Sequence, residues 1–85
     1  MLEEQAMQVE KDILKRLEQI KTEKGITDVQ WGDLAFAGAK NGRRKVQNLK
    51  HMGLRLRVGD FIQLCAALNV DPARILSSAL DTNNL

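Results

Sequence analysis

The chain has 85 residues, 44% of them apolar but only 4% aromatic, which suits one small aliphatic-cored domain and makes an enzyme with a cleft between subdomains the least expected class. No apolar run approaches the roughly 18 residues of a membrane span, the first residues include glutamates, and the single cysteine excludes an internal disulfide, so we expect a cytoplasmic protein without membrane contact. The formal net charge is +2, but the charges are unevenly distributed. Residues 34–59, the acid-free window, contain seven Lys and Arg residues and no Asp or Glu, whereas the rest of the chain has a net charge of −5. Such segregation of charge favours a polyanionic partner.

The first predicted helix is long. From Leu2 onward its apolar residues recur at intervals of three and four, at Ala6, Val9, Ile13, Leu17 and Ile20. This spacing places them on one side of a helix that ends at Gly25.

Two shorter helices are predicted next. Thr27 or Asp28 can cap a second helix that ends before Gly38, with inward residues at Trp31, Leu34 and Ala35. Asn41 can cap a third helix over residues 43–52, with Val46 and Leu49 turned inward and Gly53 ending it.

The last third of the chain predicts two more helices and no strand. Residues 59–68 are apolar nearly all round, which predicts a helix in the middle of the core. Asp71 followed by Pro72 starts a fifth helix, whose inward residues are Ile75, Leu76, Ala79 and Leu80. Residues 81–85 are expected to fray. The predicted class is therefore all-α with five helices.

The third predicted helix has an outward face suited to nucleic acid. Opposite Val46 and Leu49 lie Arg44, Gln47, Asn48 and His51, with Arg43 and Lys50 on one flank and Lys45 on the other. Arg can donate to guanine, and Gln and Asn can pair with adenine, in a major groove. The alternative is a basic helix that only keeps the protein soluble, but a solvated face usually mixes in carboxylates, and this one has none.

Four segments resemble the lambda-repressor and Cro-like helix-turn-helix family of phage and bacterial regulators. They are LEQIKTEKGIT at 17–27, the Leu34-Ala35 pair, the Val46 and Leu49 pair, and VGDFIQLCAALNVDPARIL at 58–76. The resemblance implies a compact five-helix lambda-repressor-like DNA-binding domain at 13–80, preceded by an N-terminal helical extension at 1–12 and followed by a frayed tail at 81–85. The turn at 38–42 is one residue longer than is usual in the family, and Trp31 stands where a phosphate-contacting glutamine is common.

The expected function is a sequence-specific double-stranded DNA-binding transcriptional regulator whose recognition helix lies at about 42–52. The expected base readers are Arg44, Gln47 and Asn48. The expected backbone contacts are Lys40, Arg43, Lys45, Lys50, His51, Arg55 and Arg57. A homodimer would place two recognition helices about 34 Å apart. No catalytic residue, cofactor or small-molecule ligand is indicated, and one Cys with one His cannot build a zinc site within the chain.

Two other functions stay open. An antitoxin-like or other protein-interaction module would use the long N-terminal helix, because Leu2, Ala6 and Val9 extend the apolar stripe beyond the family boundary. An RNA binder would use the basic helix, although few aromatic residues are present to stack on single strands. Leu76, Leu80 and Leu85 offer another possible dimer surface. Cys65 is expected to be buried, and Trp31 is expected to pack at the edge of the core rather than stack on a base.

Overall fold

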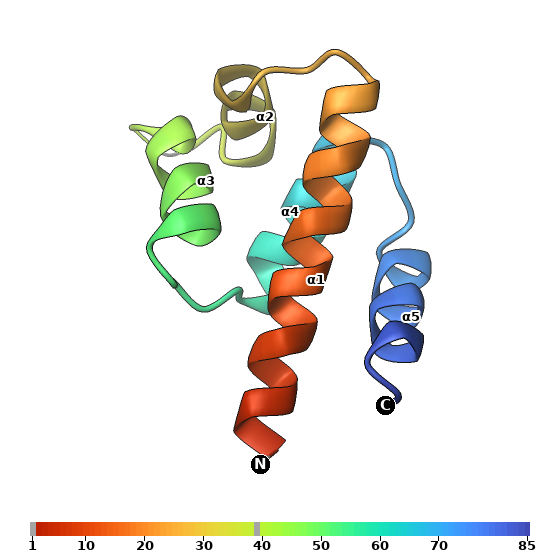
Figure 1. Ribbon diagram of the computed structural model, residues 1–85. Coiled ribbons are helices and arrows are strands. Elements are labelled where there is room, and N and C mark those ends of the chain that lie inside the picture. The colour runs from red at the N-terminus through yellow and green to blue at the C-terminus, as the bar shows by residue number, and fades with distance from the viewer. Residues whose placement is uncertain (1, 39) are drawn as a thin grey trace.

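The computed structural model describes residues 2–38 and 40–85, and these form five helices with no strand among them (Figure 1). The helices are α1 (Leu2–Glu23), α2 (Asp28–Ala35), α3 (Gly42–His51), α4 (Val58–Ala67) and α5 (Pro72–Thr82). The all-α class and the five predicted helices are therefore confirmed.

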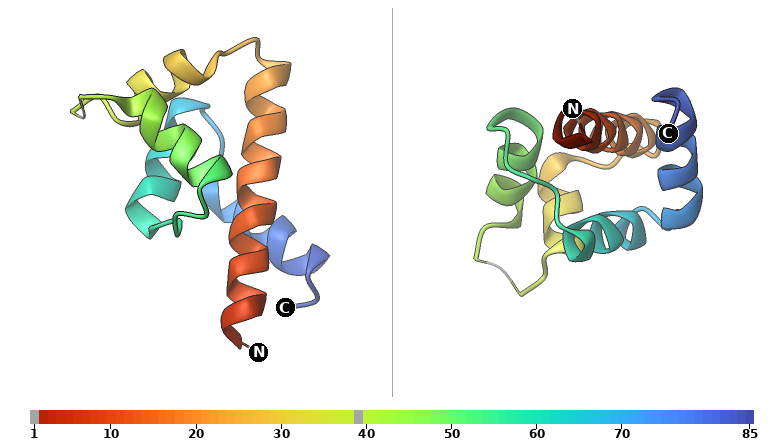
Figure 2. Two further views of the ribbon diagram at one scale, coloured as in Figure 1. Left: turned by 60° about the vertical axis from the view of Figure 1, so that its left-hand side comes forward. Right: turned by 90° about the horizontal axis from the view of Figure 1, so that it is seen from below.

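The long helix α1 forms one side of the molecule, and the shorter helices pack against it and each other. Seen from below in Figure 2, α3 and α5 flank α1 while α4 lies opposite it. The N-terminal turns of α1 project past the other helices (Figure 1). Residues 2–8 are all exposed for this reason.

The helix ends follow from local side-chain chemistry. Asn41 Oδ1 accepts the Arg44 N–H at 3.1 Å, and Asp71 Oδ1 accepts the Ala73 N–H at 2.9 Å, which confirms both predicted caps. At the start of α2 the cap is Thr27, whose side chain accepts from Gln30 N–H while the Gln30 side chain accepts from Thr27 N–H. Gly25, expected to end α1, has a φ of 71°, a conformation that favours glycine.

Side chains from four helices meet in the centre of the core. Leu17, Trp31, Val46, Leu64 and Leu68 are each at most 1% exposed. The indole Nε1 of Trp31 donates a hydrogen bond to the Leu64 carbonyl at 3.2 Å, so α2 and α4 are joined inside the core. Trp31 therefore packs centrally, which confirms packing over stacking but corrects the expected place at the core edge.

Three expectations about buried leucine and isoleucine residues were wrong. Leu34 is 62% exposed, because α2 buries the side formed by Trp31, Gly32 and Ala35, and Leu34 lies off that side. The helix α4 is not buried all round, since Ile62 is 50% exposed while Phe61, Leu64 and Cys65 face inward. Leu76 in α5 is 39% exposed, and Ala79 is the residue of α5 that is fully buried.

The expected boundary at residue 12 does not coincide with a change in packing. The helix α1 is continuous through it, and Val9 is only 7% exposed. At the other end, α5 continues through Thr82, and the Leu85 N–H donates to the Leu80 carbonyl at 2.9 Å. The helix α1 is therefore packed against the domain from Val9 onward, and a backbone hydrogen bond closes the C-terminal turn.

Candidate nucleic-acid interface

Two glycines fix how α2 and α3 meet. Gly32 and Gly42 are both buried, and a Cβ atom on either would lie closer than 3.0 Å to backbone atoms of the other. The two helices therefore touch backbone to backbone at the start of α3. Nothing in the sequence distinguishes Gly32, because a glycine inside a helix contributes no periodic pattern.

The outward face of α3 agrees with the helical wheel. Val46 and Leu49 are 1% and 3% exposed, so they anchor α3 to the core as expected. On the opposite side Arg44 and His51 are exposed. Gln47 and Asn48 are half-buried.

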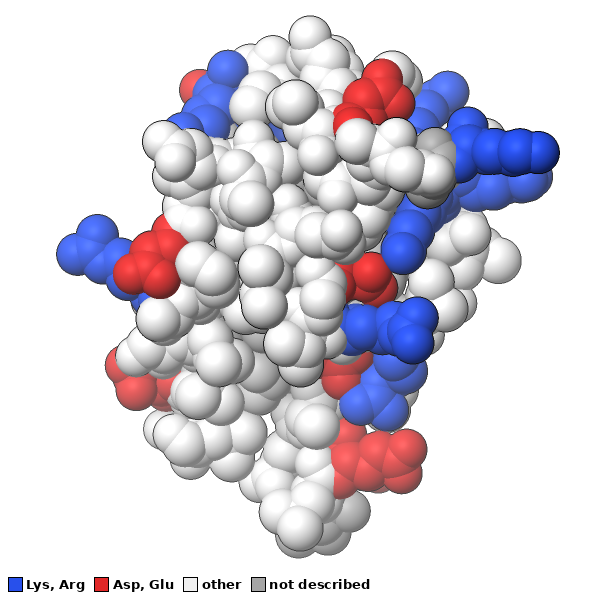
Figure 3. Space-filling view, turned by 180° about the vertical axis from the view of Figure 1, so that it is seen from behind, with Lys and Arg blue, Asp and Glu red and all other residues white. Residues whose placement is uncertain are grey.

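Four cations of the acid-free window form the unpaired group: Lys40, Arg43, Arg44 and Arg57. All four are exposed, and none makes an ion pair with a carboxylate of the described residues. Seen from behind in Figure 3, Lys and Arg side chains gather along the edge of the molecule formed by α3 and the loop after it. The unpaired group gives a polyanion exposed positive charges that have no carboxylate partner among the described residues.

The other three cations of the window form the paired group: Lys45, Lys50 and Arg55. Lys50 Nζ lies 2.9 Å from Glu18 Oε2 and 3.1 Å from Asp28 Oδ2, and its side chain is 14% exposed. Lys21 Nζ of α1 lies 2.9 Å from Glu18 and 2.6 Å from Asp28. Two ammonium groups and two carboxylates thus join α1, α2 and α3.

Contacts within this four-charge network shift the pKa values of its two carboxylates. Burial alone would raise the pKa of Asp28, but hydrogen bonds from Lys21 and Lys50 outweigh it and hold that pKa below its usual value. The pKa of Glu18 is lowered in the same way against burial, through Lys50 and Lys21. Both carboxylates therefore stay ionised well into acid.

Lys45 is turned toward α4 rather than outward. Its Nζ lies 3.0 Å from Asp60 Oδ1, a carboxylate whose side chain is only 8% exposed, and 4.5 Å from the centroid of the Phe36 ring. The ammonium group thereby compensates a buried charge and covers an aromatic face. Lys45 therefore links α3 to α4.

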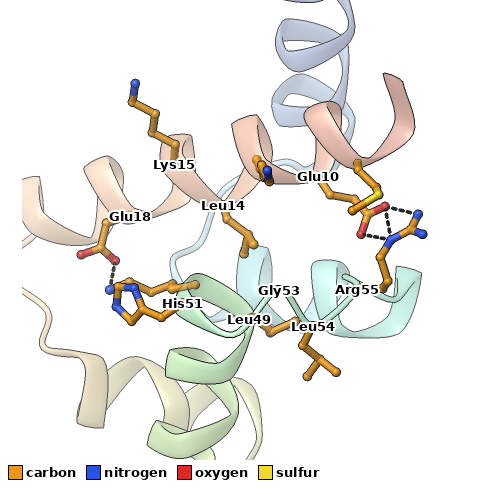
Figure 4. A pocket seen from close by; sticks show the side chains of 12 residues that line it. Glu10, Leu14, Lys15, Glu18, Leu49, His51, Gly53, Leu54 and Arg55 are labelled. Carbon is orange, nitrogen blue, oxygen red and sulfur yellow. Dashed lines mark hydrogen bonds and ion pairs between the residues drawn. The ribbon is translucent and has the colours of Figure 1, made fainter. Parts of the chain in front are cut away.

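Arg55 is paired across the groove that separates α1 from α3 and the following loop. The groove has a volume of about 450 Å³, and Leu14, Leu49 and Leu54 line it. Glu10 and Arg55 face each other at one end of it (Figure 4). Arg55 Nε donates to the two carboxylate oxygens of Glu10 at 3.0 and 2.9 Å, and the hydrogen bonds from Arg55 hold the pKa of Glu10 below its usual value.

The structure thus divides the expected backbone contacts. Lys40, Arg43 and Arg57 are exposed and unpaired, and His51 is exposed and lines the groove. Lys45, Lys50 and Arg55 are held by carboxylates from α4, α1 and α2. No local sequence pattern indicates this division, because the carboxylates lie outside the acid-free window and reach it only when the helices pack.

Other reactive groups offer no competing site within residues 2–38 and 40–85. Cys65 is buried as expected, and burial, with a smaller effect of Asp71, raises the pKa of its thiol to about 11, which keeps it protonated at neutral pH. No three His, Cys, Asp or Glu side chains in this part of the chain are grouped to hold a metal ion. None of its helices combines the length and apolar character needed to cross a bilayer.

Comparison of the chain with protein-family models, with curated proteins and with solved structures returned no match.

Proposed function

We propose that this chain is a sequence-specific double-stranded DNA-binding protein, a small transcriptional regulator of the lambda-repressor and Cro-like type, with α3 as its recognition helix. The observation that carries the proposal is the outward face of α3. It combines an exposed Arg44 with the half-buried Gln47 and Asn48, and the exposed cations Lys40, Arg43 and Arg57 of the same acid-free window have no carboxylate partner among the described residues. Arginine with Gln and Asn is the donor and acceptor set that reads guanine and adenine in the major groove.

Binding proceeds in two stages in this proposal. The unpaired group attracts the duplex, and its contacts with phosphates release condensed counterions. The helix α3 then enters the major groove, where Arg44, Gln47 and Asn48 contact base edges. Lys40, Arg43 and Arg57 hold the backbone, with His51 at the flank of the interface.

The junction of α2 and α3 supports a rigid recognition unit. Because the Gly32 and Gly42 backbones are in contact, α3 has little freedom to tilt relative to α2. Lys45 and Lys50 fasten α3 to α4 and α1, so we assign them a role in holding the helix rather than in contacting phosphates. A helix held in this way can present its base-reading side chains without an ordering cost on binding.

Selection of bound sequences from a random duplex pool is the first test, because it reports binding and the preferred site together. Affinity for the selected site should fall steeply with salt, by roughly one power of the salt concentration for each phosphate contact. Selection of no sequence, or an affinity independent of salt, would contradict the proposal.

Matched charge variants identify the surface that binds. Arg44→Gln should weaken binding to the selected duplex by roughly 1–3 kcal/mol, because it removes a base contact. Arg74→Gln in α5 removes the same charge from an exposed residue away from α3 and should change the affinity less than about twofold. Equal losses from the two variants would mean that the charge alone, and not the α3 face, determines binding.

One observation favours a second candidate, a protein-interaction module. Residues 2–8 of α1 are exposed and project from the domain, and Leu2 is 82% exposed. A partner helix could pack on this tip. Removing residues 1–7 spares Val9 and Glu10, so the domain should stay folded. If the truncated chain keeps its duplex affinity and its oligomeric state in solution, the tip is dispensable for both DNA binding and self-association.

A further inference from the structure

Three hydrogen-bond donors converge on the carboxylate of Glu10. Besides its Nε contacts, Arg55 donates through a terminal guanidinium nitrogen to Oε2 at 2.5 Å, and the backbone N–H of Leu56 donates to Oε1 at 2.7 Å. The donors belong to the loop between α3 and α4, whereas Glu10 belongs to α1. Glu3 contributes a second, longer ion pair to Arg55, at 3.9 Å.

The donors are those of a phosphate site. A guanidinium fork together with a backbone N–H binds phosphate oxygens as readily as carboxylate oxygens, since both anions accept charge-assisted hydrogen bonds. The Arg55 side chain is 50% exposed and the Glu10 side chain is 20% exposed, so an approaching anion can reach the guanidinium. Glu10 therefore occupies an anion site that is accessible from solvent.

The site lies on the edge that the proposed function assigns to DNA. Arg55 is two residues before Arg57 of the unpaired group, and the loop that holds both follows α3 along this edge (Figures 1 and 3). A duplex seated on α3 would bring its backbone toward this loop. Acidic side chains of α1 lie at the end of the same edge, through Glu3 and Glu10.

We propose that Glu10 is an intramolecular competitor of DNA: its carboxylate fills the anion site of Arg55 and the Leu56 N–H, and a DNA phosphate gains that site only by displacing it. This inference rests on the proposed function. It assigns to α1 a part in setting affinity, because the acidic start of that helix holds one cation of the basic window away from the duplex. In the wild-type chain, duplex binding is then weaker than the window alone would give.

Glu10→Gln tests the competition directly. Glutamine keeps the size of the side chain but removes the charge that competes with phosphate. Affinity for the selected duplex should rise about five- to tenfold at low salt, and the salt slope should steepen by about one contact. The control is Glu23→Gln, which removes the same charge at the other end of α1, where no ion pair is formed among the described residues, and should change affinity less than about twofold.

Arg55→Gln tests whether the gain in duplex affinity depends on Arg55. In the wild-type background it should change affinity less than about twofold, because Glu10 already occupies the guanidinium. In the Glu10→Gln background it should abolish the gain. An unchanged affinity of Glu10→Gln, or a gain that persists without Arg55, would overturn the proposal.

Glu10→Asp provides a second variant in case Glu10→Gln loosens the fold. Aspartate leaves Arg55 and the Leu56 N–H unchanged, but its shorter side chain weakens the contact that competes with phosphate, so affinity should rise by about two- to fivefold. A folded Glu10→Asp protein that binds no tighter than wild type would also overturn the proposal. Failure of this inference is separable from failure of the proposed function. If the wild type binds duplex and Arg44→Gln weakens binding, but Glu10→Gln has no effect, the inference alone is overturned. If no variant binds duplex, both are overturned.

Discussion

The two ends of α3 differ in what surrounds their positive charges. At its N-terminal end and in the preceding turn, Lys40, Arg43 and Arg44 are exposed and have no carboxylate partner within the described residues. At its C-terminal end and in the following loop, Lys50 and Arg55 are paired with carboxylates of α1 and α2. A window without acids in the sequence is thus not free of acids in space, because packing brings carboxylates to Lys50 and Arg55, and to Lys45 within α3, while Arg57 has no carboxylate partner among the described residues.

The largest effect on stability is expected at the N-terminal end of α3, where its backbone contacts α2. Gly32→Ala places a methyl group against the Gly42 backbone, so the free energy of unfolding should fall by about 3 kcal/mol or more. Gly59→Ala in α4 has nothing within 4 Å and should be neutral or stabilising by about 0.5–1 kcal/mol. Denaturant unfolding of both variants measures the difference, and equal stability would rule out the close contact of α2 with α3.

The paired end is tested by Asp28→Asn. The substitution removes a negative charge shared by Lys21 and Lys50 and leaves two ammonium groups with Glu18 alone, so we expect a loss of about 1–3 kcal/mol. Asp33→Asn, exposed on the same helix and outside the ion pairs of the described residues, should change stability by less than about 0.5 kcal/mol. Similar thermal unfolding of the two variants would show that the network does not fasten α3.

Binding separates the two ends in another way. Gln47→Ala should lower discrimination between duplex sequences by roughly 1–2 kcal/mol, because it removes a proposed base contact while the proposed phosphate contacts remain. Lys50→Gln should lower the stability of the fold but leave the duplex affinity of the folded protein within about twofold of wild type, since Lys50 is already held by two carboxylates. Titration of labelled cognate and mismatched duplexes checks both, and a uniform loss of affinity with Lys50→Gln would return Lys50 to the DNA backbone.

The smallest expected effect is the pH dependence of the stability that the ion pairs of Lys50 contribute. The pKa values of Glu18 and Asp28 are lowered in the folded chain from ordinary values of 4.5 and 3.8. The stability they contribute is therefore fully present above those ordinary values and is lost as pH falls through the lower folded values. We expect a loss of about 1 kcal/mol from this network between about pH 6 and pH 3, and a smaller loss in Asp28→Asn. Urea unfolding of both proteins at the two pH values measures the difference, and parallel losses would place the acid sensitivity elsewhere.

Local chemistry explains why much of the fold could be predicted from the sequence. The caps at Asn41 and Asp71 bond to residues two or three positions away, so the sequence contains all that they require. The orientation of α3 was also predicted correctly from the sequence, because the two buried residues Val46 and Leu49 define its inward side.

Features that depend on how helices meet could not be predicted. Ile62 and Leu76 read as core residues but are partly exposed, because the positions of neighbouring helices decide which apolar side is covered. The partners of Lys50 and Arg55 lie at sequence separations of 22 and 45 residues or more, beyond any local pattern. The contact of Gly32 with Gly42 likewise arises only once α2 and α3 are packed.

The central place of Trp31 makes the chain its own optical reporter. It is the only tryptophan, its side chain is fully buried, and its indole is bonded to Leu64 of α4. Its emission therefore follows the packing of α2 on α4 and should be protected from soluble quenchers while the domain is folded. Because no part of this ring reaches the surface of α3, a fluorescence change on adding DNA would signal a rearrangement of the core rather than direct contact with a base.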